Sequence, residues 1–209
     1  MLNKEYKIYL FDFDGTLMDS FPSLAYIFKT AFKEVGVVIK DEDVPYLSRV
    51  SLTEGYYKFA KNEDLIDKYI KSVKVHLHDY EALKLTRPFE DALRLFERIK
   101  NRNIAIGLVT SNELKHVNDV MDYLHLDASI FKVIIGSDIL PIIKPNPEPI
   151  YLALRKLDYK GELSDVIYVG DGLNDYKCAL NAGVTPLMLD RDGSYDDTFN
   201  KIKSLDEIL

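Results

Sequence analysis

The chain has little cysteine and no long apolar segment, and both features narrow its class. Among its 209 residues there is a single cysteine, Cys178, so no disulfide can form within the chain. Such sparing use of cysteine fits a reducing compartment. No apolar run approaches the roughly 20 residues of a membrane-spanning helix, and the N-terminus shows no signal-peptide pattern. We therefore expect a cytoplasmic protein without a membrane segment.

Basic residues are not in excess either. The 27 Lys and Arg residues are outnumbered by 34 Asp and Glu residues, and the net charge is -7, which argues against a nucleic-acid-binding surface. Neither GxxxxGK[ST] nor GxGxxG occurs, so a nucleotide-binding loop of either type is disfavoured. The length suffices for a main domain with a second one inserted into it.

Four apolar segments run directly into polar residues of different chemical types. The first is 8–17, which carries Asp12 and then Asp14. The others are 104–109, followed by Thr110, Ser111 and Asn112; 132–136, ahead of a loop with Lys144; and 166–169, followed by Asp171 and Asp175. Such continuous apolar runs are typical of parallel strands covered on both faces. Because ligands bind at the carboxyl ends of such strands, these polar groups are predicted to converge.

Two carboxylates at the end of a buried strand point to a cation. Asp12 and Asp14 would repel each other and lose hydration if they stood there unpaired. A divalent metal ion removes that conflict, so a metal site is predicted at the end of the first strand.

The ordered segments Asp12-Phe13-Asp14-Gly15-Thr16, Thr110, Lys144-Pro145 and Gly170-Asp171 to Asp175 resemble the four motifs of the haloacid dehalogenase superfamily of phosphohydrolases. The resemblance covers nearly the whole chain. It implies an α/β fold, with a Rossmann-like parallel sheet, helices on both faces and an inserted α-helical cap domain. This arrangement is that of phosphoglycolate phosphatases, pyrophosphatases, nucleotidases and β-phosphoglucomutases.

The periodicity of the chain predicts where the cap lies. Between about Pro22 and Thr86 apolar residues recur with helical spacing, and Ser51 and Glu54 have capping-box spacing. After Pro88, helical and strand patterns alternate, as in parallel strands joined by crossover helices, and 185–189 is a candidate fifth strand. We expect a core formed by 1–20 and 87–209 and a cap formed by 21–86.

The chemistry of phosphate esters then suggests roles for the first motif. Asp12 is the expected nucleophile, forming an aspartyl-phosphate that water hydrolyses, and Asp14 is the expected general acid and base. Gly15 allows a sharp turn, and Thr16 can donate to the phosphoryl group.

The remaining motifs are expected to bind the metal and the phosphate. Mg²⁺ prefers oxygen ligands, and Asp12 and Asp171 supply them. The resemblance implies that Asp14 adds its backbone carbonyl, whereas Asp175 either binds through water or orients Lys144. The phosphate-binding groups are expected to be the Thr110 hydroxyl with Ser111 and Asn112, and the charge of Lys144.

These features predict a Mg²⁺-dependent phosphatase acting on a small phosphorylated metabolite, and they leave alternatives open. A mutase that returns the phosphoryl group to a sugar remains possible, as does a phospho-binding protein without turnover. Phosphoglycolate, a nucleotide, a sugar phosphate and pyrophosphate are all candidate substrates. Arg49 can reach a substrate anion from the cap, and the oligomeric state is not readable from the sequence.

Two other patterns invite a functional reading that their spacing does not support. One is the acidic run Asp190-Arg191-Asp192-Gly193, followed by Asp196 and Asp197. Its glycine comes too early for a calcium-binding loop and no closing glutamate follows, so it predicts a surface turn. His76 and His78 lie in a helical stretch without a third ligand, and predict a solvated helix.

Overall fold

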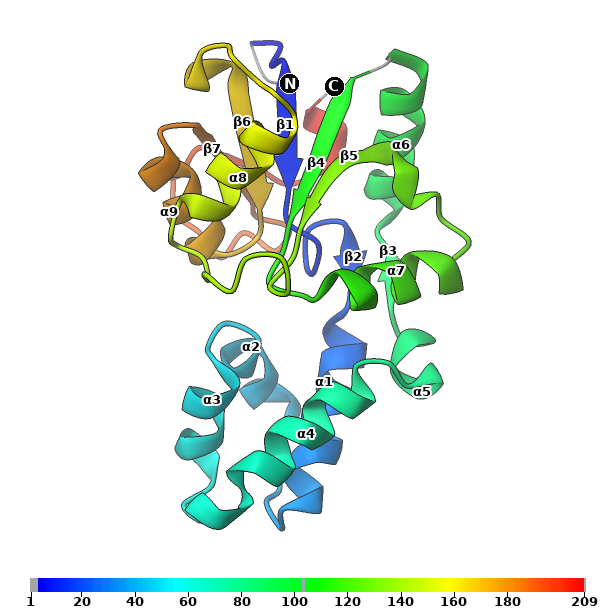
Figure 1. Cartoon of the computed structure of the whole chain (residues 1–209), viewed down its shortest axis with the longest axis vertical. Coiled ribbons are helices and arrows are strands. Elements are labelled where there is room, and N and C mark those ends of the chain that lie inside the picture. The colour runs from blue at the N-terminus through cyan, green and yellow to red at the C-terminus, as the bar shows by residue number, and fades with distance from the viewer. Residues whose placement is uncertain (1–3, 103, 209) are drawn as a thin grey trace. The chain divides into compact units, whose positions relative to one another are not determined.

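A six-stranded parallel sheet forms the centre of the larger part of the chain, as seen in a computed structural model that describes residues 4–102 and 104–208 (Figure 1). The strand order is β5-β4-β1-β6-β7-β8. The bounds are β1 Ile8–Phe11, β4 Ala105–Val109, β5 Phe131–Ile135, β6 Val166–Gly170, β7 Thr185–Leu189 and β8 Lys201–Ile202. The predicted α/β fold is confirmed, and within this sheet the short edge strand β8 was not predicted.

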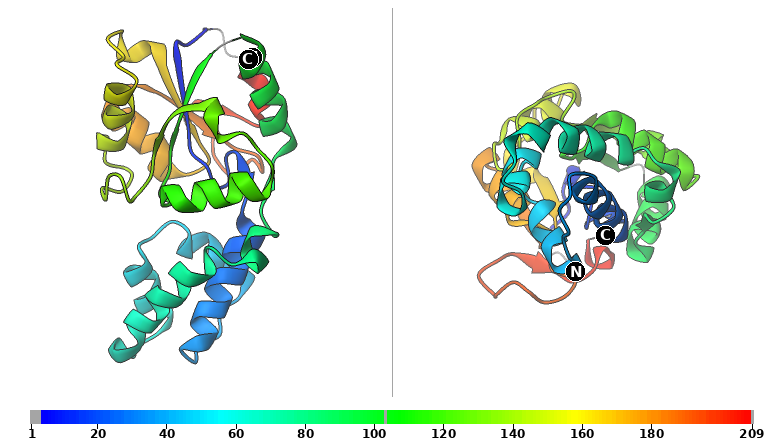
Figure 2. Two further views of the ribbon diagram at one scale, coloured as in Figure 1. Left: turned by 45° about the vertical axis from the view of Figure 1, so that its right-hand side comes forward. Right: turned by 90° about the horizontal axis from the view of Figure 1, so that it is seen from below.

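Helices cover both faces of this sheet (Figures 1 and 2). They are α6 Glu90–Arg102, α7 Leu114–Tyr123, α8 Glu148–Lys156 and α9 Leu173–Ala182. Alternate residues of β1 explain the two layers, since neighbours along a strand point to opposite faces. Ile8 and Leu10 belong to a core cluster with residues of α8 and α9 such as Ile150 and Ala179. Figure 2 shows α6 on the other side of the sheet from α8 and α9.

The chain divides into two compact units. The core unit contains the described residues up to Asp19 and from Pro88 onward, and the insert unit contains Ser20–Arg87. Two short strands flank the insertion, β2 Met18–Asp19 and β3 Arg87–Pro88, and they pair with each other. The insertion thus leaves and returns at one place in the core unit.

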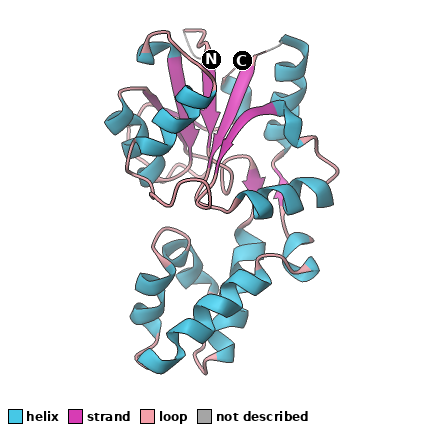
Figure 3. Ribbon diagram, viewed as in Figure 1, coloured by secondary structure: helices cyan, strands magenta, loops and turns pink. Residues whose placement is uncertain are grey.

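The insert unit consists of helices and their connecting loops (Figure 3). They are α1 Phe21–Glu34, α2 Val44–Leu47, α3 Leu52–Phe59, α4 Ile66–His76 and α5 Tyr80–Leu83, with 3₁₀ turns at Asp41–Asp43 and Glu63–Leu65. Apolar and aromatic side chains of α1, α3 and α4 form its core, with Phe32 packed against Tyr56 and Tyr69. This small hydrophobic core is separate from that of the sheet.

Helix signals in the insert unit are partly confirmed. Ser51 caps α3, because its hydroxyl accepts a hydrogen bond from the Glu54 backbone N–H at 3.1 Å. The reciprocal half of the capping box is replaced, since the Glu54 carboxylate accepts from the Tyr46 hydroxyl at 3.2 Å. Among the described residues, no helix is both long and apolar enough to cross a membrane.

Candidate active site

The site lies where the strand order reverses. The chain places β4 on one side of β1 and β6 on the other, all parallel, and a sheet of this kind binds ligands outside the carboxyl ends at such a point. Asp12 directly follows β1, Thr110 follows β4, and Asp171 follows β6. The backbone N–H of Asp12 donates to the Val169 carbonyl at 2.9 Å, which carries the sheet pairing up to the site.

Lys144 occupies the centre of a buried polar cluster. Its ammonium lies 2.6 Å from Asp12 Oδ1, 2.5 Å from Asp175 Oδ1 and 3.2 Å from the Tyr168 hydroxyl. These three side chains satisfy the three N–H donors of the ammonium. The side chains of Lys144 and Asp12 are only 9% and 10% exposed, so this is a desolvated charge pair and not a surface one.

Burial and neighbouring charge act in opposite directions on this pair. Burial raises the pKa of Asp12 well above its usual range, and Asp175 and Asp171 raise it further, against the opposing effect of Lys144. Burial would lower the pKa of Lys144, but Asp12 and Asp175 outweigh it and hold that pKa well above its usual range. The neighbouring carboxylates thus favour the charged form of Lys144 and disfavour that of Asp12.

Asp171 brings a third carboxylate to the same place. Ligand-capable oxygens of Asp12, Asp171 and Asp175 all lie within 4.8 Å of one another. One lysine cannot balance three carboxylates, whereas an oxygen-preferring divalent cation matches both the donor type and the charge deficit. The residues present therefore fit a metal site, as the sequence predicted for this edge of the sheet.

Only glycine fits at position 15, because the loop after β1 passes very close to Asp171 there. The φ of Gly15 is +74°, and a Cβ atom placed on it would lie 2.5 Å from Asp171 Oδ2. The next residue, Thr16, is fully buried and donates its hydroxyl to Asp171 Oδ1 at 3.3 Å. Thr16, expected to contact the phosphate, thus contacts the fourth motif in this structure.

Both oxygens of Asp175 are engaged. Oδ2 accepts from the Gly172 backbone N–H at 3.1 Å, at the start of α9. Oδ1 accepts from Lys144 and also from the Tyr168 hydroxyl, at 3.0 Å. This locked position corresponds to one of the two alternatives left open for Asp175, the orientation of Lys144.

Asp14 stands apart from the three-carboxylate group. Its Oδ2 accepts from the Asn112 side-chain amide at 2.5 Å. The Asn112 backbone N–H in turn donates to the buried Thr110 hydroxyl at 3.2 Å. Asn112, expected to bind substrate, therefore orients Asp14 here, and the loop after β4 is tied to the loop after β1.

A pocket lies beside these groups in the core unit. Thr110, Ser111 and Lys144 line its polar side, and Ile135 and Leu140 are among its apolar residues. Ser111 is exposed, whereas Thr110 is buried. A hydroxyl, a backbone N–H and an ammonium at one pocket wall suit a phosphoryl group. Arg49 lies on the surface of the insert unit, between α2 and α3.

Sequence reasoning missed three polar residues that contact the site loops. Tyr168 was treated only as a strand residue, although a tyrosine inside a buried strand needs a partner for its hydroxyl. The segment 190–193 forms a turn with Asp192 and Gly193 exposed, as expected, although Asp190 is only 1% exposed. Arg191 donates to the Thr16 carbonyl at 2.9 Å, and the Tyr195 hydroxyl donates to the Asp171 carbonyl at 3.1 Å. No local spacing signal marks these contacts, because they join distant segments.

Comparison with known proteins agrees with this geometry. The family model described as haloacid dehalogenase-like hydrolase matches residues 9–189. The chain is 28% identical over 189 residues to a phosphoglycolate phosphatase of Pasteurella multocida, covering 86% of this chain and 83% of that protein. It is 29% identical over 175 residues to the pyrophosphatase PpaX of Oceanobacillus iheyensis, covering 84% and 79%.

A solved structure shows the same fold. A haloacid dehalogenase-like hydrolase from Bacteroides fragilis superimposes with a TM-score of 0.85 at 24% identity, covering 98% of this chain and 100% of that chain. The chain therefore belongs to the haloacid dehalogenase-like hydrolase family. Within it, the chain is an enzyme homologous to phosphoglycolate phosphatases and PpaX pyrophosphatases.

Proposed function

We propose that this hydrolase is a Mg²⁺-dependent phosphatase acting on a small phosphorylated metabolite, with Asp12 as its nucleophile. The observation that carries the proposal is the position of Asp12, a buried carboxylate 2.6 Å from Lys144 and within a group of three carboxylates. A nucleophile that attacks an anionic phosphate needs positive charge beside it, which Lys144 supplies and a metal ion held by the carboxylates would increase.

Asp12 attacks phosphorus while the leaving oxygen departs on the opposite side. Lys144 holds the Asp12 carboxylate and lowers the repulsion between that carboxylate and the incoming phosphate. The Thr110 hydroxyl and the backbone N–H of Ser111 bind phosphoryl oxygens. The bond that forms joins Asp12 Oδ to phosphorus, and hydrolysis of this aspartyl-phosphate by water returns Asp12 and releases phosphate.

Asp14 serves both half-reactions as the proton carrier. Its protonated carboxyl gives a proton to the leaving oxygen, and its carboxylate then takes one from the attacking water. The hydrogen bond from Asn112 supports this assignment, because it orients the Asp14 carboxyl without filling the three-carboxylate group.

The metal ion in this proposal is Mg²⁺, held by Asp12 and Asp171 with the Asp14 backbone carbonyl. When bound, it supplies positive charge that stabilises the phosphoryl oxygens during transfer. Asp175 orients Lys144, since both of its oxygens are already engaged.

The insert unit is proposed to be the cap that reads the leaving group, with Arg49 as a contact for a substrate anion. Phosphoglycolate and pyrophosphate are the first substrates to test, because relatives of this chain are a phosphoglycolate phosphatase and a pyrophosphatase. Nucleotides and sugar phosphates complete the set.

The decisive experiment measures phosphate release from these compounds by the purified protein, with Mg²⁺ and with excess chelator. Asp12→Asn is the blank, because it removes the nucleophile and keeps the side-chain shape. Metal-dependent release by the wild type alone supports the proposal. Transfer of the phosphoryl group between positions of a sugar, without release, would instead identify a mutase. Binding of phosphate compounds without either reaction would identify a phospho-binding protein.

A further inference from the structure

The loop that follows β7 is folded onto a buried carboxylate. Asp190 Oδ1 accepts from the Ser194 backbone N–H at 2.8 Å, and its Oδ2 accepts from the Tyr195 backbone N–H at 3.3 Å. Gly193, with φ +75°, allows the chain to reverse between them. Asp190–Tyr195, called here the β7 loop, is therefore a compact turn that presents Arg191 and Tyr195 in fixed directions.

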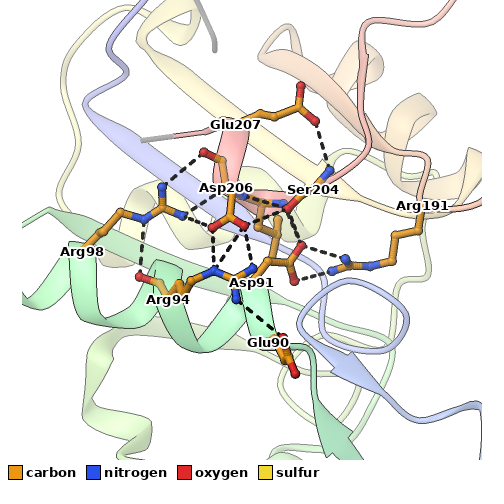
Figure 4. Close-up of polar contacts among 9 residues, drawn as sticks. Glu90, Asp91, Arg94, Arg98, Arg191, Ser204, Asp206 and Glu207 are labelled. Carbon is orange, nitrogen blue, oxygen red and sulfur yellow. Dashed lines mark hydrogen bonds and ion pairs between the residues drawn. The ribbon is translucent and has the colours of Figure 1, made fainter.

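Arg191 joins the β7 loop to the loop after β1. Its Nη2 donates to the Thr16 backbone carbonyl at 2.9 Å. Its two terminal nitrogens bind Asp91 at 2.7 and 3.1 Å, as Figure 4 shows. The guanidinium also stacks on Phe89, with its central carbon 3.8 Å from the ring centroid. Because Asp91 binds the edge of the guanidinium and Phe89 packs against its plane, Arg191 has little conformational freedom. The hydrogen bond from Arg191 therefore restricts the position of the Thr16 carbonyl.

Asp91 is in turn held from several directions. It is 5% exposed and accepts hydrogen bonds from the Ser204 hydroxyl and the Leu205 backbone N–H, both at 2.9 Å (Figure 4). Burial would raise the pKa of Asp91, but these bonds and the Arg191 guanidinium outweigh it and lower that pKa. Asp91, which anchors Arg191, is thus a buried carboxylate that accepts several hydrogen bonds, and its ion pair with Arg191 is not a loose surface pair.

Tyr195 joins the same β7 loop to the other side of the site. Its hydroxyl donates to the Asp171 backbone carbonyl at 3.1 Å. Its ring packs edge-on against Phe199, at 5.4 Å between centroids. The β7 loop therefore binds the backbone of both the loop after β1 and the loop after β6, next to Asp12 and Asp171.

The spacing of these two loops is tight. Thr16 and Asp171 are linked at 3.3 Å, and Gly15 has no room for a Cβ atom beside Asp171. A small displacement of either loop would change the distances among the carboxylate oxygens. Mg²⁺ demands near-ideal ligand geometry, so it is sensitive to such a change.

We propose that Arg191 and Tyr195 are positioning residues, which set the spacing of the Asp12 and Asp171 loops and thereby the affinity for the metal ion. This inference rests on the proposed function, because it assumes that Asp12 and Asp171 hold the metal ion of that hydrolase. Neither residue touches the reacting atoms. Each acts through a backbone carbonyl.

The test compares two pairs of variants. Tyr195→Phe removes the hydroxyl that binds Asp171, and Tyr176→Phe removes a hydroxyl from the same aromatic group, where it accepts from the Asn200 backbone N–H at 3.2 Å. Arg191→Met removes the contact with Thr16. Its control is Arg94→Met, because Arg94 lies on α6, as Asp91 does, and forms an ion pair with Asp206. Both control side chains lie outside the three-carboxylate group and bind residues other than Thr16 and Asp171.

The readout is Mg²⁺ binding by titration calorimetry in the absence of substrate, with circular dichroism to confirm folding. Arg191→Met is expected to weaken Mg²⁺ binding by about 10- to 100-fold, as for other residues that orient metal ligands. Tyr195→Phe is expected to weaken it by about fivefold, the loss of one hydrogen bond. Tyr176→Phe and Arg94→Met are expected to bind Mg²⁺ as the wild type does.

Wild-type Mg²⁺ affinity in a folded Tyr195→Phe protein and a folded Arg191→Met protein would overturn the inference. If Arg191→Met does not fold, Tyr195→Phe against Tyr176→Phe decides alone. Equal weakening in the test and control variants also overturns it, since the effect would then be general destabilisation. If Arg191→Met and Tyr195→Phe weaken Mg²⁺ binding as expected but the wild type releases no phosphate, the proposed function is contradicted and the positioning role is still supported.

Discussion

The hydroxyl of Tyr168 lies 3.0 Å from Asp175 Oδ1, inside the strand that leads to the fourth motif. The hydroxyl oxygen of Tyr168 accepts from Lys144 at 3.2 Å, and its single proton has two acceptors within reach, Asp175 Oδ1 and the Val109 carbonyl at 2.9 Å. One buried hydroxyl therefore contacts residues of three of the four motif segments. Its loss leaves an ammonium donor and a buried carbonyl without this partner, which typically costs about 1 to 3 kcal/mol.

Tyr168→Phe is accordingly expected to lower kcat by about tenfold while the fold is kept, because an unsatisfied Lys144 is less well held against Asp12. Steady-state phosphate release measures this. Tyr9→Phe is the matched control, because Tyr9 is a buried tyrosine on β1, the strand next to the β6 strand of Tyr168. Its hydroxyl accepts from the Tyr6 backbone N–H at 3.2 Å. Equal losses in the two variants would contradict a specific role for Tyr168.

Asp12→Asn is expected to lower turnover by about 10³-fold or more, because it removes the covalent nucleophile. Stability should not fall in proportion, since the change also removes one of three clustered carboxylates. Phosphate release together with urea unfolding separates the two effects. An Asp12→Asn protein with normal turnover would sink the mechanism.

Lys144→Met is expected to lower the free energy of unfolding by about 3 kcal/mol near neutral pH, because it leaves buried carboxylates without their cation. The carboxyl pKa of Asp12, already raised by burial, then rises further. A raised carboxyl pKa costs stability above that pKa, and the cost disappears as the pH falls and the group takes up a proton. The deficit should therefore be smaller in acid.

Urea unfolding in the presence of chelator, at two pH values, measures the Lys144→Met effect. Lys115→Met serves as control, because Lys115 forms an ion pair with Asp119 on the surface of α7 at 2.6 Å. Exposed pairs of this kind contribute about 0 to 1 kcal/mol. A pH-independent deficit in Lys144→Met would argue against the acidic cluster as its cause.

Saturating Mg²⁺ is expected to raise the unfolding temperature of the wild type, because a ligand that binds only the folded state adds about 2.7 kcal/mol at a hundred times its Kd. Asp171→Asn should need a higher Mg²⁺ concentration for the same shift, since it loses a charged ligand. Asp127→Asn, an exposed acid that accepts from the Ser129 backbone N–H, is the control. Identical Mg²⁺ titrations for both variants would exclude Asp171 as a ligand.

The insert unit should respond to pH through His76. The ring of His76 lies 2.5 Å from Asp79 Oδ2 and 3.1 Å from Glu34 Oε1, on a helix with a solvent-exposed face. Burial would lower the pKa of His76, but the hydrogen bonds with Asp79 and Glu34 raise it above 6.5. A raised histidine pKa stabilises the folded state below the unfolded pKa, and this stability is lost as pH rises through the folded value.

His76→Gln should therefore unfold at a lower temperature than the wild type at about pH 5.5, and the difference should shrink by about pH 8.5. Scanning calorimetry at both pH values measures this, and His78→Gln is the control on the neighbouring turn. A His76 effect that is constant between the two pH values would show that packing, and not the charge, is responsible.

Much of the fold follows from the local pattern of the chain. The apolar runs at 104–109, 166–169 and 185–189 match β4, β6 and β7 closely, because strands buried on both faces leave a continuous hydrophobic signal. The edge strand β8 Lys201–Ile202 has too few residues for any periodicity. The contents of the site followed from the motifs at the strand ends.

The supporting contacts of the site could not be read in the same way. Asn112 was expected to bind substrate, yet its amide holds Asp14. Arg191 reaches Thr16 from the opposite end of the chain, and Tyr195 reaches Asp171. Each contact depends on which loops the tertiary fold brings together, and nothing in the neighbouring sequence encodes that distance.

The position of β1 in the sheet has a consequence for how the protein is made. Ile8 pairs with Ala105 on one side and with Val166 on the other. During synthesis this apolar strand leaves the ribosome well before either of its partners, which lie about 100 and 160 residues further along the chain. Pairings so distant in sequence form slowly, and an unpaired strand is prone to aggregation meanwhile. The apolar strand that ends in Asp12 therefore needs protection from aggregation until β4 and β6 have been made.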